Sequence, residues 1–194
     1  MVYLNDDIEH FDLQTALPLL SEQRREQCLR FKFDLGRKQC AAAYLLLCEG
    51  LRQEYGVTEP PVFEYGEHGK PAIVGHADIY FNLSHCREAV LCVLSDHPVG
   101  CDVESISRYK ESLARYTMND EEMAQILSSE NPDVAFTRLW TMKEAVLKRS
   151  GTGIINDMKT VLSASPAASV LGGSAAEITT FINEAKGYIY SITK

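Results

Sequence analysis

The sequence has no apolar run long enough to cross a membrane. A spanning helix needs about 20 apolar residues in succession, whereas the longest candidates, residues 41–48 and 89–94, have the length of buried helices or strands. The first seven residues contain two acids and no base, whereas a secretory signal peptide begins with basic residues. We therefore expect a cytoplasmic protein.

Positive charge is also scarce. The chain has 19 Lys and Arg against 27 Asp and Glu, which gives a net charge of −8 at pH 7. Proteins that bind nucleic acids or anionic membranes through phosphates carry the opposite balance, so we expect neither partner. A local group of basic residues would still suffice for one small anionic ligand.

Familiar cysteine and nucleotide motifs are missing. The six cysteines show no C-x-x-C spacing and lie mostly in apolar stretches, which favours reduced thiols in the core over zinc ligands. There is no Walker A sequence and no G-x-G-x-x-G, so the two phosphate-binding loops of those types are excluded. No G-x-S-x-G elbow is present, which argues against a serine nucleophile.

The composition is that of an ordinary globular protein, with 194 residues, 45% of them hydrophobic and 24% charged. Apolar periodicity predicts helices over residues 22–31, 35–55, 109–115, 120–128 and 133–150. Short strands are expected at 2–4, 62–65, 71–74, 79–83, 89–94, 99–104, 160–163, 176–181 and 188–193. Helix followed by antiparallel strands, twice, predicts an α+β fold with two similar lobes, residues 1–97 and 98–194.

Two acidic residues, separated by one position, lie on the strand expected at 99–104. Asp102 and Glu104 project to the same face because side chains alternate along a strand, while Cys101 and Val103 point into the core. Carboxylate oxygens in such an arrangement suit Mg²⁺, which also takes phosphate oxygens as ligands. The alternative is a solvated strand end, where acids are common.

The helix expected at 133–150 carries further charged residues. Glu144 and Lys148 are four residues apart, a spacing that also serves ordinary helix support. Lys143 falls within the apolar stripe that contains Trp140, so its ammonium needs a partner or must line a cleft.

Two further groups carry polar side chains near turns. Asn82 and Ser84 share one strand face, and His85 follows, either as a donor to an anion or as a structural histidine. The turn His68-Gly69-Lys70-Pro71 offers backbone N–H groups and a cation to a phosphate, although turns of this composition are usually only turns.

In this order, the motifs H-G-K-P, F-N-L-S-H, G-C-D-V-E and L-W-T-M-K-E-A-V-L-K resemble those of the 4′-phosphopantetheinyl transferases of the surfactin-synthetase type. The W-x-x-K-E-A segment is the most specific, and the resemblance covers roughly residues 20 to 155. It implies Mg²⁺-dependent transfer of the phosphopantetheine arm of coenzyme A to a serine of an acyl or peptidyl carrier protein. The implied fold is a monomeric pseudo-dimer of two lobes, each a helix packed on a small antiparallel sheet, with the active site in the cleft between them.

The resemblance also implies roles for individual residues. Asp102, Glu104 and Glu144 would hold Mg²⁺, with Glu144 also the general base and Lys148 both catalytic and in contact with the pyrophosphate. Contacts to coenzyme A would come from Arg37, Gly69, Lys70, Ser84 and His85, with Lys32 or Lys38 as alternatives to Arg37.

Some features leave other interpretations open. Many family members have Gly-Lys-Gly after the long helix, where this chain has Gly151-Thr152-Gly153. A hydrolase of coenzyme A or nucleotide pyrophosphates and a non-catalytic binding module are the alternatives. Candidate residues for contact with the carrier protein, unless they merely form a solvated helix, are Arg108, Tyr109, Lys110, Arg115, Tyr116 and Met118.

Overall fold

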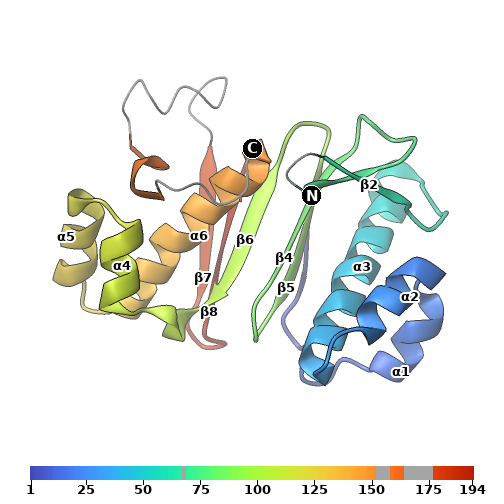
Figure 1. Cartoon of the computed structure of the whole chain (residues 1–194), viewed down its shortest axis with the longest axis horizontal. Helices are drawn as coiled ribbons and strands as arrows, with labels where there is room; N and C mark the ends of the chain where they lie inside the picture. The colour runs from blue at the N-terminus through green and yellow to red at the C-terminus, as the bar shows by residue number, and fades with distance from the viewer. Residues whose placement is uncertain (67–68, 152–157, 164–176) are drawn as a thin grey trace.

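A computed structural model describes residues 1–66, 69–151, 158–163 and 177–194 (Figure 1). The first half of the chain contains β1 (Val2–Asn5), α1 (Leu13–Ala16), α2 (Glu22–Leu29), α3 (Asp34–Tyr55), β2 (Phe63–Tyr65), β3 (Pro71–Ile73), β4 (Tyr80–His85) and β5 (Val90–Ser95). The second half contains β6 (Gly100–Ser105), α4 (Glu111–Thr117), α5 (Asp120–Ser128), α6 (Pro132–Ser150), β7 (Ile178–Asn183) and β8 (Tyr188–Thr193).

The elements form four layers. Two antiparallel sheets, with strand orders β1-β5-β4 and β6-β8-β7, lie next to each other in the middle of the molecule. Helix α3 covers the outer face of the first sheet and α6 covers the outer face of the second (Figure 1). The described residues thus confirm an α+β fold of helices on small antiparallel sheets. A separate hairpin joins β2 and β3.

Strand β5 explains why residues 89–94 are apolar without alternation. All six are completely buried. Leu91 and Val93 belong to a cluster with side chains of β6 and β8, whereas Cys92 and Leu94 belong to one with side chains of α3. A strand that is covered on both faces has no solvent side on which to place polar residues.

Strands β4 and β6 lie side by side in different sheets, and side chains rather than backbone groups join them. The Asn82 Oδ1 atom accepts a hydrogen bond from the Cys101 N–H at 3.0 Å. Ser84 Oγ accepts one from the Val103 N–H at 3.2 Å. Because buried backbone N–H groups need partners, the two polar residues of β4 satisfy the edge of the neighbouring sheet.

Helix α6 has defined ends and a close approach to β6. Asn131 caps its first turn by accepting from the Val134 N–H, and Gly151 ends it with a φ of 73°. Gly100 is required where β6 begins, because a Cβ there would lie 2.0 Å from the Ala145 carbonyl oxygen.

Most expected elements are confirmed to within a few residues. The strand predicted at 160–163 is wrong, because the described part of that segment contains a 3₁₀ turn at Met158–Thr160. The four-residue helix α1 was not predicted, since one turn is too short to show periodicity. All six cysteines are free thiols, as expected. Within the described ranges, no helix is long and apolar enough to cross a membrane.

Candidate functional site

Three of the predicted site residues meet at the seam between the two sheets. Ser84 comes from β4, Asp102 from β6 and Lys148 from α6. The Lys148 Nζ donates to Asp102 Oδ1 at 2.6 Å and to Ser84 Oγ at 3.0 Å, while Ser84 Oγ donates to the same Asp102 oxygen at 2.8 Å. Both Ser84 and Asp102 are buried. Residues distant in sequence therefore form one polar cluster, in which Lys148 is half-buried.

The hydroxyl of Ser84 is fully used within the protein. Its single proton goes to Asp102, and its oxygen accepts from the Val103 N–H and from Lys148. This arrangement fixes one carboxylate oxygen of Asp102. The other, Oδ2, is buried and has no hydrogen-bond partner among the described residues.

Lys148 keeps its charge in this setting. Burial is the largest single influence and lowers its pKa, but the attraction of Asp102 together with smaller contributions outweighs it, and the net effect raises the pKa above that of an ordinary lysine. Glu144, one helical turn earlier, contributes to the same effect. The site therefore contains a cation at neutral pH, held by the carboxylate of Asp102.

The remaining predicted residues of this region surround the cluster. Glu104 lies two residues beyond Asp102 on β6 and is half-buried, and Glu144 is buried on α6. His85 ends β4 with an exposed side chain, yet desolvation by its surroundings and the charge of Lys148 lower its pKa. The imidazole is therefore neutral at pH 7.

The donor set suits a hard cation such as Mg²⁺. Asp102, Glu104 and Glu144 supply only oxygen atoms, and the orphaned Oδ2 of Asp102 is a ligand atom with nothing else to bind. In the described parts of the chain, no three His, Cys, Asp or Glu side chains converge closely enough to form a metal site. The ligand types thus fit the ion, and the role of each carboxylate stays a prediction.

The predicted contacts to coenzyme A are spread more widely. Gly69 lies in the turn before β3 with a φ of 78°, and the Lys70 ammonium reaches the end of α6 instead of the Ser84 cluster. His68 lies outside the described residues. Arg37 is on the first turn of α3, where it pairs with Asp34 at 3.1 Å.

The two alternatives to Arg37 are engaged locally. The Lys32 ammonium lies over the ring of Phe33 with 5.3 Å to its centroid. Lys38 donates to the Glu9 carbonyl oxygen. Like that of Arg37, their roles toward the cofactor stay predictions.

Lys143 has a structural partner that explains its place in the apolar stripe. Its completely buried ammonium pairs with Glu122 of α5 at 2.8 Å and donates to the Met158 carbonyl oxygen at 2.7 Å. Trp140, one turn earlier, packs against Phe136 in the core of this half.

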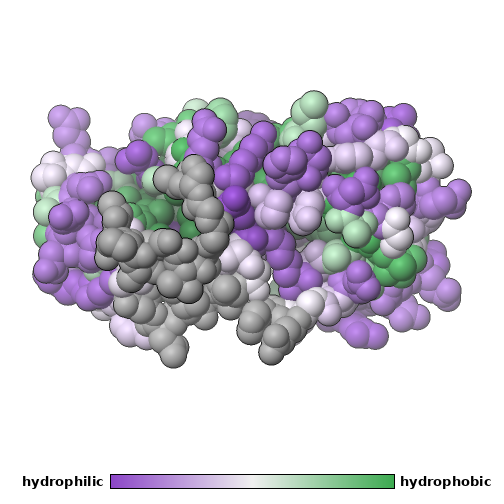
Figure 2. Space-filling view, turned by 90° about the horizontal axis from the view of Figure 1, so that it is seen from above, coloured by the Kyte–Doolittle hydropathy of each residue, from purple (hydrophilic) through white to green (hydrophobic). Residues whose placement is uncertain are grey.

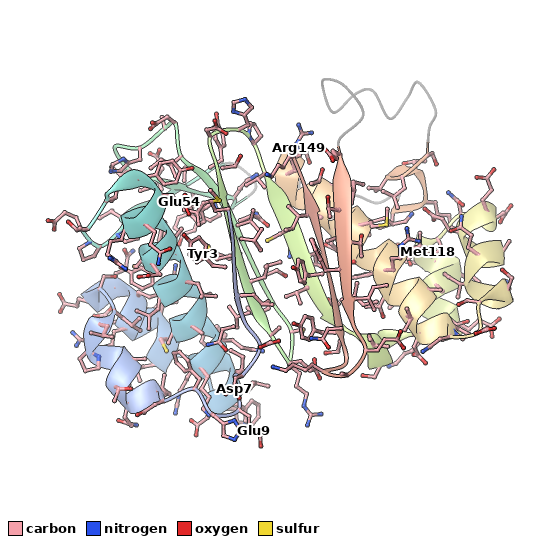
Figure 3. All side chains as sticks on the ribbon, turned by 180° about the vertical axis from the view of Figure 1, so that it is seen from behind. Tyr3, Asp7, Glu9, Glu54, Met118 and Arg149 are labelled. Carbon is pink, nitrogen blue, oxygen red and sulfur yellow. The ribbon has the colours of Figure 1, made fainter. Side chains whose placement is uncertain are left out.

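The surface proposed for contact with the carrier protein is only partly exposed. Met118 is buried in the hydrophobic core, so its assignment was wrong (Figure 3). Tyr109 packs against Phe136, and Arg115 pairs with Glu111. Tyr116 is 73% exposed. The side chain of Arg108 lies outside the description, and the role of Lys110 stays a prediction.

Sequence reasoning missed how Asn82 and Ser84 work. Both were placed on one strand face, but not as partners for the backbone of β6. The signal was their spacing of two residues on a strand that is otherwise apolar, since a polar pair there needs partners.

Comparison with known proteins agrees with this geometry. Residues 98–190 match the family model of the 4′-phosphopantetheinyl transferase superfamily. The 4′-phosphopantetheinyl transferase Sfp of Bacillus subtilis (strain 168) is 24% identical over 156 residues, which are 79% of this chain and 70% of the relative.

Two further relatives carry the same functional name. A 4′-phosphopantetheinyl transferase of Bacillus pumilus is 29% identical over 78% of this chain and 66% of its own length. The 4′-phosphopantetheinyl transferase AcpT of Salmonella typhimurium is 41% identical over 47% of this chain and 50% of the relative. The chain therefore spans about two thirds of its longer matches, and the matched segment includes β6 and α6 with the carboxylates and Lys148. Over residues 98–190 the chain is similar to the 4′-phosphopantetheinyl transferase superfamily, and its relatives carry the same name.

Proposed function

We propose that this chain transfers the 4′-phosphopantetheine arm of coenzyme A to a serine of an acyl or peptidyl carrier protein. Adenosine 3′,5′-bisphosphate is the leaving product. The observation that carries the proposal is the Ser84–Asp102–Lys148 cluster, in which a half-buried ammonium is held against a buried carboxylate at a seam between two sheets. The relatives named above, all 4′-phosphopantetheinyl transferases, support the same activity.

The proposed architecture is a pseudo-dimer of two lobes, residues 1–97 and 98–194, with coenzyme A between them. In support, each half has a three-stranded antiparallel sheet covered by its longest helix. One chain then supplies both sides of the cleft, so we propose a monomer. The free thiols favour the reducing cytoplasm, and the acidic composition favours neither nucleic acid nor a membrane as a partner.

Lys148 is placed to stabilise charge during the transfer. The carrier serine oxygen forms a bond to the phosphorus that bears the pantetheine arm, and the bond from this phosphorus to the bridging oxygen breaks. The electron pair leaves with adenosine 3′,5′-bisphosphate, on which negative charge develops. The charge that Lys148 keeps in this half-buried position favours the developing negative charge, because water screens it less than on an open surface.

Glu144 is the proposed general base. It lies buried on α6 one turn before Lys148, and its carboxylate would accept the proton of the carrier serine hydroxyl. Asp102, Glu104 and Glu144 would hold Mg²⁺, which when bound neutralises pyrophosphate charge.

The cofactor contacts form the remaining part of the proposal. His85, neutral at pH 7, would donate an N–H to the 3′-phosphate, with Arg37 as a second donor on α3. Gly69 would offer backbone groups to the adenine end. Ser84 would act near the phosphates through Asp102 and Lys148, because its own proton is already donated.

The test is intact-mass spectrometry of an apo acyl carrier protein incubated with this chain, coenzyme A and Mg²⁺. We expect the carrier to gain the mass of one phosphopantetheine group. No such gain should occur when the reaction contains a chelator. Consumption of coenzyme A without a mass gain on several carriers would instead favour a pyrophosphate hydrolase. If neither a mass gain nor consumption of coenzyme A occurred, a non-catalytic binding module would be the better explanation.

A variant tests the role of Glu144. Glu144→Gln should lower the transfer rate by at least about 100-fold, because it removes the base and one carboxylate charge. Glu121→Gln, an exposed site on α5, is the matched control and should leave the rate unchanged. A fully active Glu144→Gln enzyme would contradict the assignment.

A further inference from the structure

Lys70 connects the two halves of the chain at the end of α6. It lies directly before β3 in the first half, but its ammonium donates to the carbonyl oxygens of Lys148 at 2.7 Å and Arg149 at 2.8 Å in the second. A third, longer hydrogen bond of 3.3 Å goes to the carbonyl oxygen of Val99, just before β6. The three N–H groups of one ammonium are thereby directed at three backbone oxygens.

The C-terminal end of a helix favours such a cation. The last four carbonyl groups of a helix lack partners within it, and the helix dipole makes this end negative. The Leu147 carbonyl receives the Gly151 N–H and the Ser150 hydroxyl. The next two carbonyls, of Lys148 and Arg149, receive Lys70.

Gly151 makes room for this contact. A Cβ at Gly151 would lie 3.2 Å from Cδ of Lys70, and the residue has a φ of 73°. The stem of the lysine therefore passes over the glycine that ends α6. From above, hydrophilic side chains gather over the centre of this face between the two halves (Figure 2).

The contact acts directly on the candidate active site. Lys148 is held at both ends, with its carbonyl oxygen bound by Lys70 and its ammonium bound by Asp102 at 2.6 Å. The Val99 carbonyl precedes the strand that carries Asp102. A single side chain of the first half thus fixes the end of α6 and the start of β6.

We propose that Lys70 is a positioning residue, which caps α6 from the opposite half of the molecule and so holds Lys148 over Asp102. It acts through Lys148 and not by direct contact with a phosphate of the cofactor, since its N–H groups are directed at carbonyl oxygens. The kinetic consequence rests on the proposed transferase function. The capping itself does not.

The kinetic test compares Lys70→Met with Lys186→Met, which removes another lysine that links the two halves, through Asp6. Lys70→Met should lower kcat about tenfold, because misplaced catalytic groups cost rate, while KM for coenzyme A changes less than about twofold. Lys186→Met should leave both constants unchanged. In a Lys148→Ala background, Lys70→Met should cause almost no further loss of kcat, because the group it positions is gone.

Two kinetic outcomes would overturn the proposal. An increase in KM with kcat unchanged would mean that Lys70 contacts coenzyme A. An equal loss of kcat with and without Lys148 would mean that Lys70 does not act through it. If Lys70→Met fails to fold, Lys70→Gln retains a shorter hydrogen-bond donor and should show an intermediate kcat.

A second readout needs no activity. Backbone amide hydrogen exchange at the end of α6, including the Gly151 N–H, should be faster in Lys70→Met than in the wild type or in Lys186→Met. Unchanged exchange would refute the cap even if the wild-type chain transfers phosphopantetheine. Faster exchange in an enzyme without transfer activity would support the cap while the proposed function fails.

Discussion

At the scale of single residues, the polar groups of this protein are buried in pairs or clusters whose members come from different elements. Ser84 is joined to Asp102 and Lys148, and Lys143 is joined to Glu122. A buried charge is expensive unless it is compensated. Lys143 and Lys148 of the long helix α6 therefore depend on groups that lie far away in the sequence.

The buried ion pair of Lys143 gives a prediction for stability. Lys143→Met keeps the side-chain length but leaves the buried carboxylate of Glu122 without its cation, so the free energy of unfolding should fall by about 3 to 5 kcal/mol. Urea unfolding followed by circular dichroism measures the change. Lys159→Met, at an exposed lysine, should alter it by less than about 0.5 kcal/mol.

A second variant shows whether the unpaired charge is the cause. Glu122 also accepts the Asn119 N–H at the start of α5, and glutamine can keep this capping bond without a charge. Adding Glu122→Gln to Lys143→Met should therefore restore a large part of the lost stability. No recovery would mean that the contact of Lys143 with the Met158 carbonyl carries the effect.

At the scale of elements, the contact between α6 and β6 brings the site together. Both carry predicted site residues, and Gly100 permits their close approach. In Gly100→Ala, the new Cβ would lie 2.0 Å from the Ala145 carbonyl oxygen and 2.4 Å from the Arg149 nitrogen. Backbone atoms in a helix cannot move aside as a flexible side chain can, so strand and helix must separate.

The expected result is a loss of stability of about 3 kcal/mol or more, the upper end of the range for overpacking, together with slower transfer. Gly66→Ala is the control, because among the described residues a Cβ there meets only one atom, at 3.7 Å. Thermal unfolding and the carrier mass shift measure the two effects. An unchanged melting temperature in Gly100→Ala would contradict the close packing described.

Most elements follow from local patterns in the sequence, whereas their contacts do not. Asn131, Pro132 and Gly151 mark the ends of α6, and alternation placed Asp102 and Glu104 on one face. The partner of Lys70 lies 78 residues further along the chain, and no local pattern encodes such a distance. Likewise, Met118 lies in a stretch of sequence with charged residues, which indicates a surface position. Its side chain instead packs in the core next to α4.

At the scale of the whole molecule, the two halves are joined along a seam that has polar contacts at both ends and the Ser84–Asp102–Lys148 cluster between them. Lys70 and the end of α6 form one end, marked by Arg149 in Figure 3, and the segment next to Asp7 forms the other. Between them, the apolar side chains of β5, β6 and β8 form a shared core. Because the proposed cofactor site lies on this seam, the contacts next to it, those of Lys70, also affect catalysis.

The end of the seam opposite Lys70 predicts a dependence of stability on pH. Asp6, after β1, pairs with Lys186 at 2.8 Å and accepts from the Tyr188 hydroxyl at 2.8 Å. The hydrogen bond from Lys186 is the main cause of its lowered pKa, and burial only partly opposes it. The folded protein therefore holds the proton of Asp6 less tightly than the unfolded chain does.

A carboxyl group with a lowered pKa stabilises the fold above its ordinary pKa, and this stabilisation is lost as the pH falls through the folded value. Asp6→Asn should lower the free energy of unfolding at pH 7 by about 1 kcal/mol. Below about pH 4, where an ordinary aspartate takes up its proton, the difference from the wild type should shrink.

Asp7→Asn, which alters only an exposed pair with His10, should show a smaller difference at pH 7. Urea unfolding at about pH 3 to pH 7 measures these differences in the free energy of unfolding. These limits lie about one unit below and about three units above the ordinary pKa of aspartate. A difference for Asp6→Asn that stayed constant over this range would mean that its charge does not join the two halves.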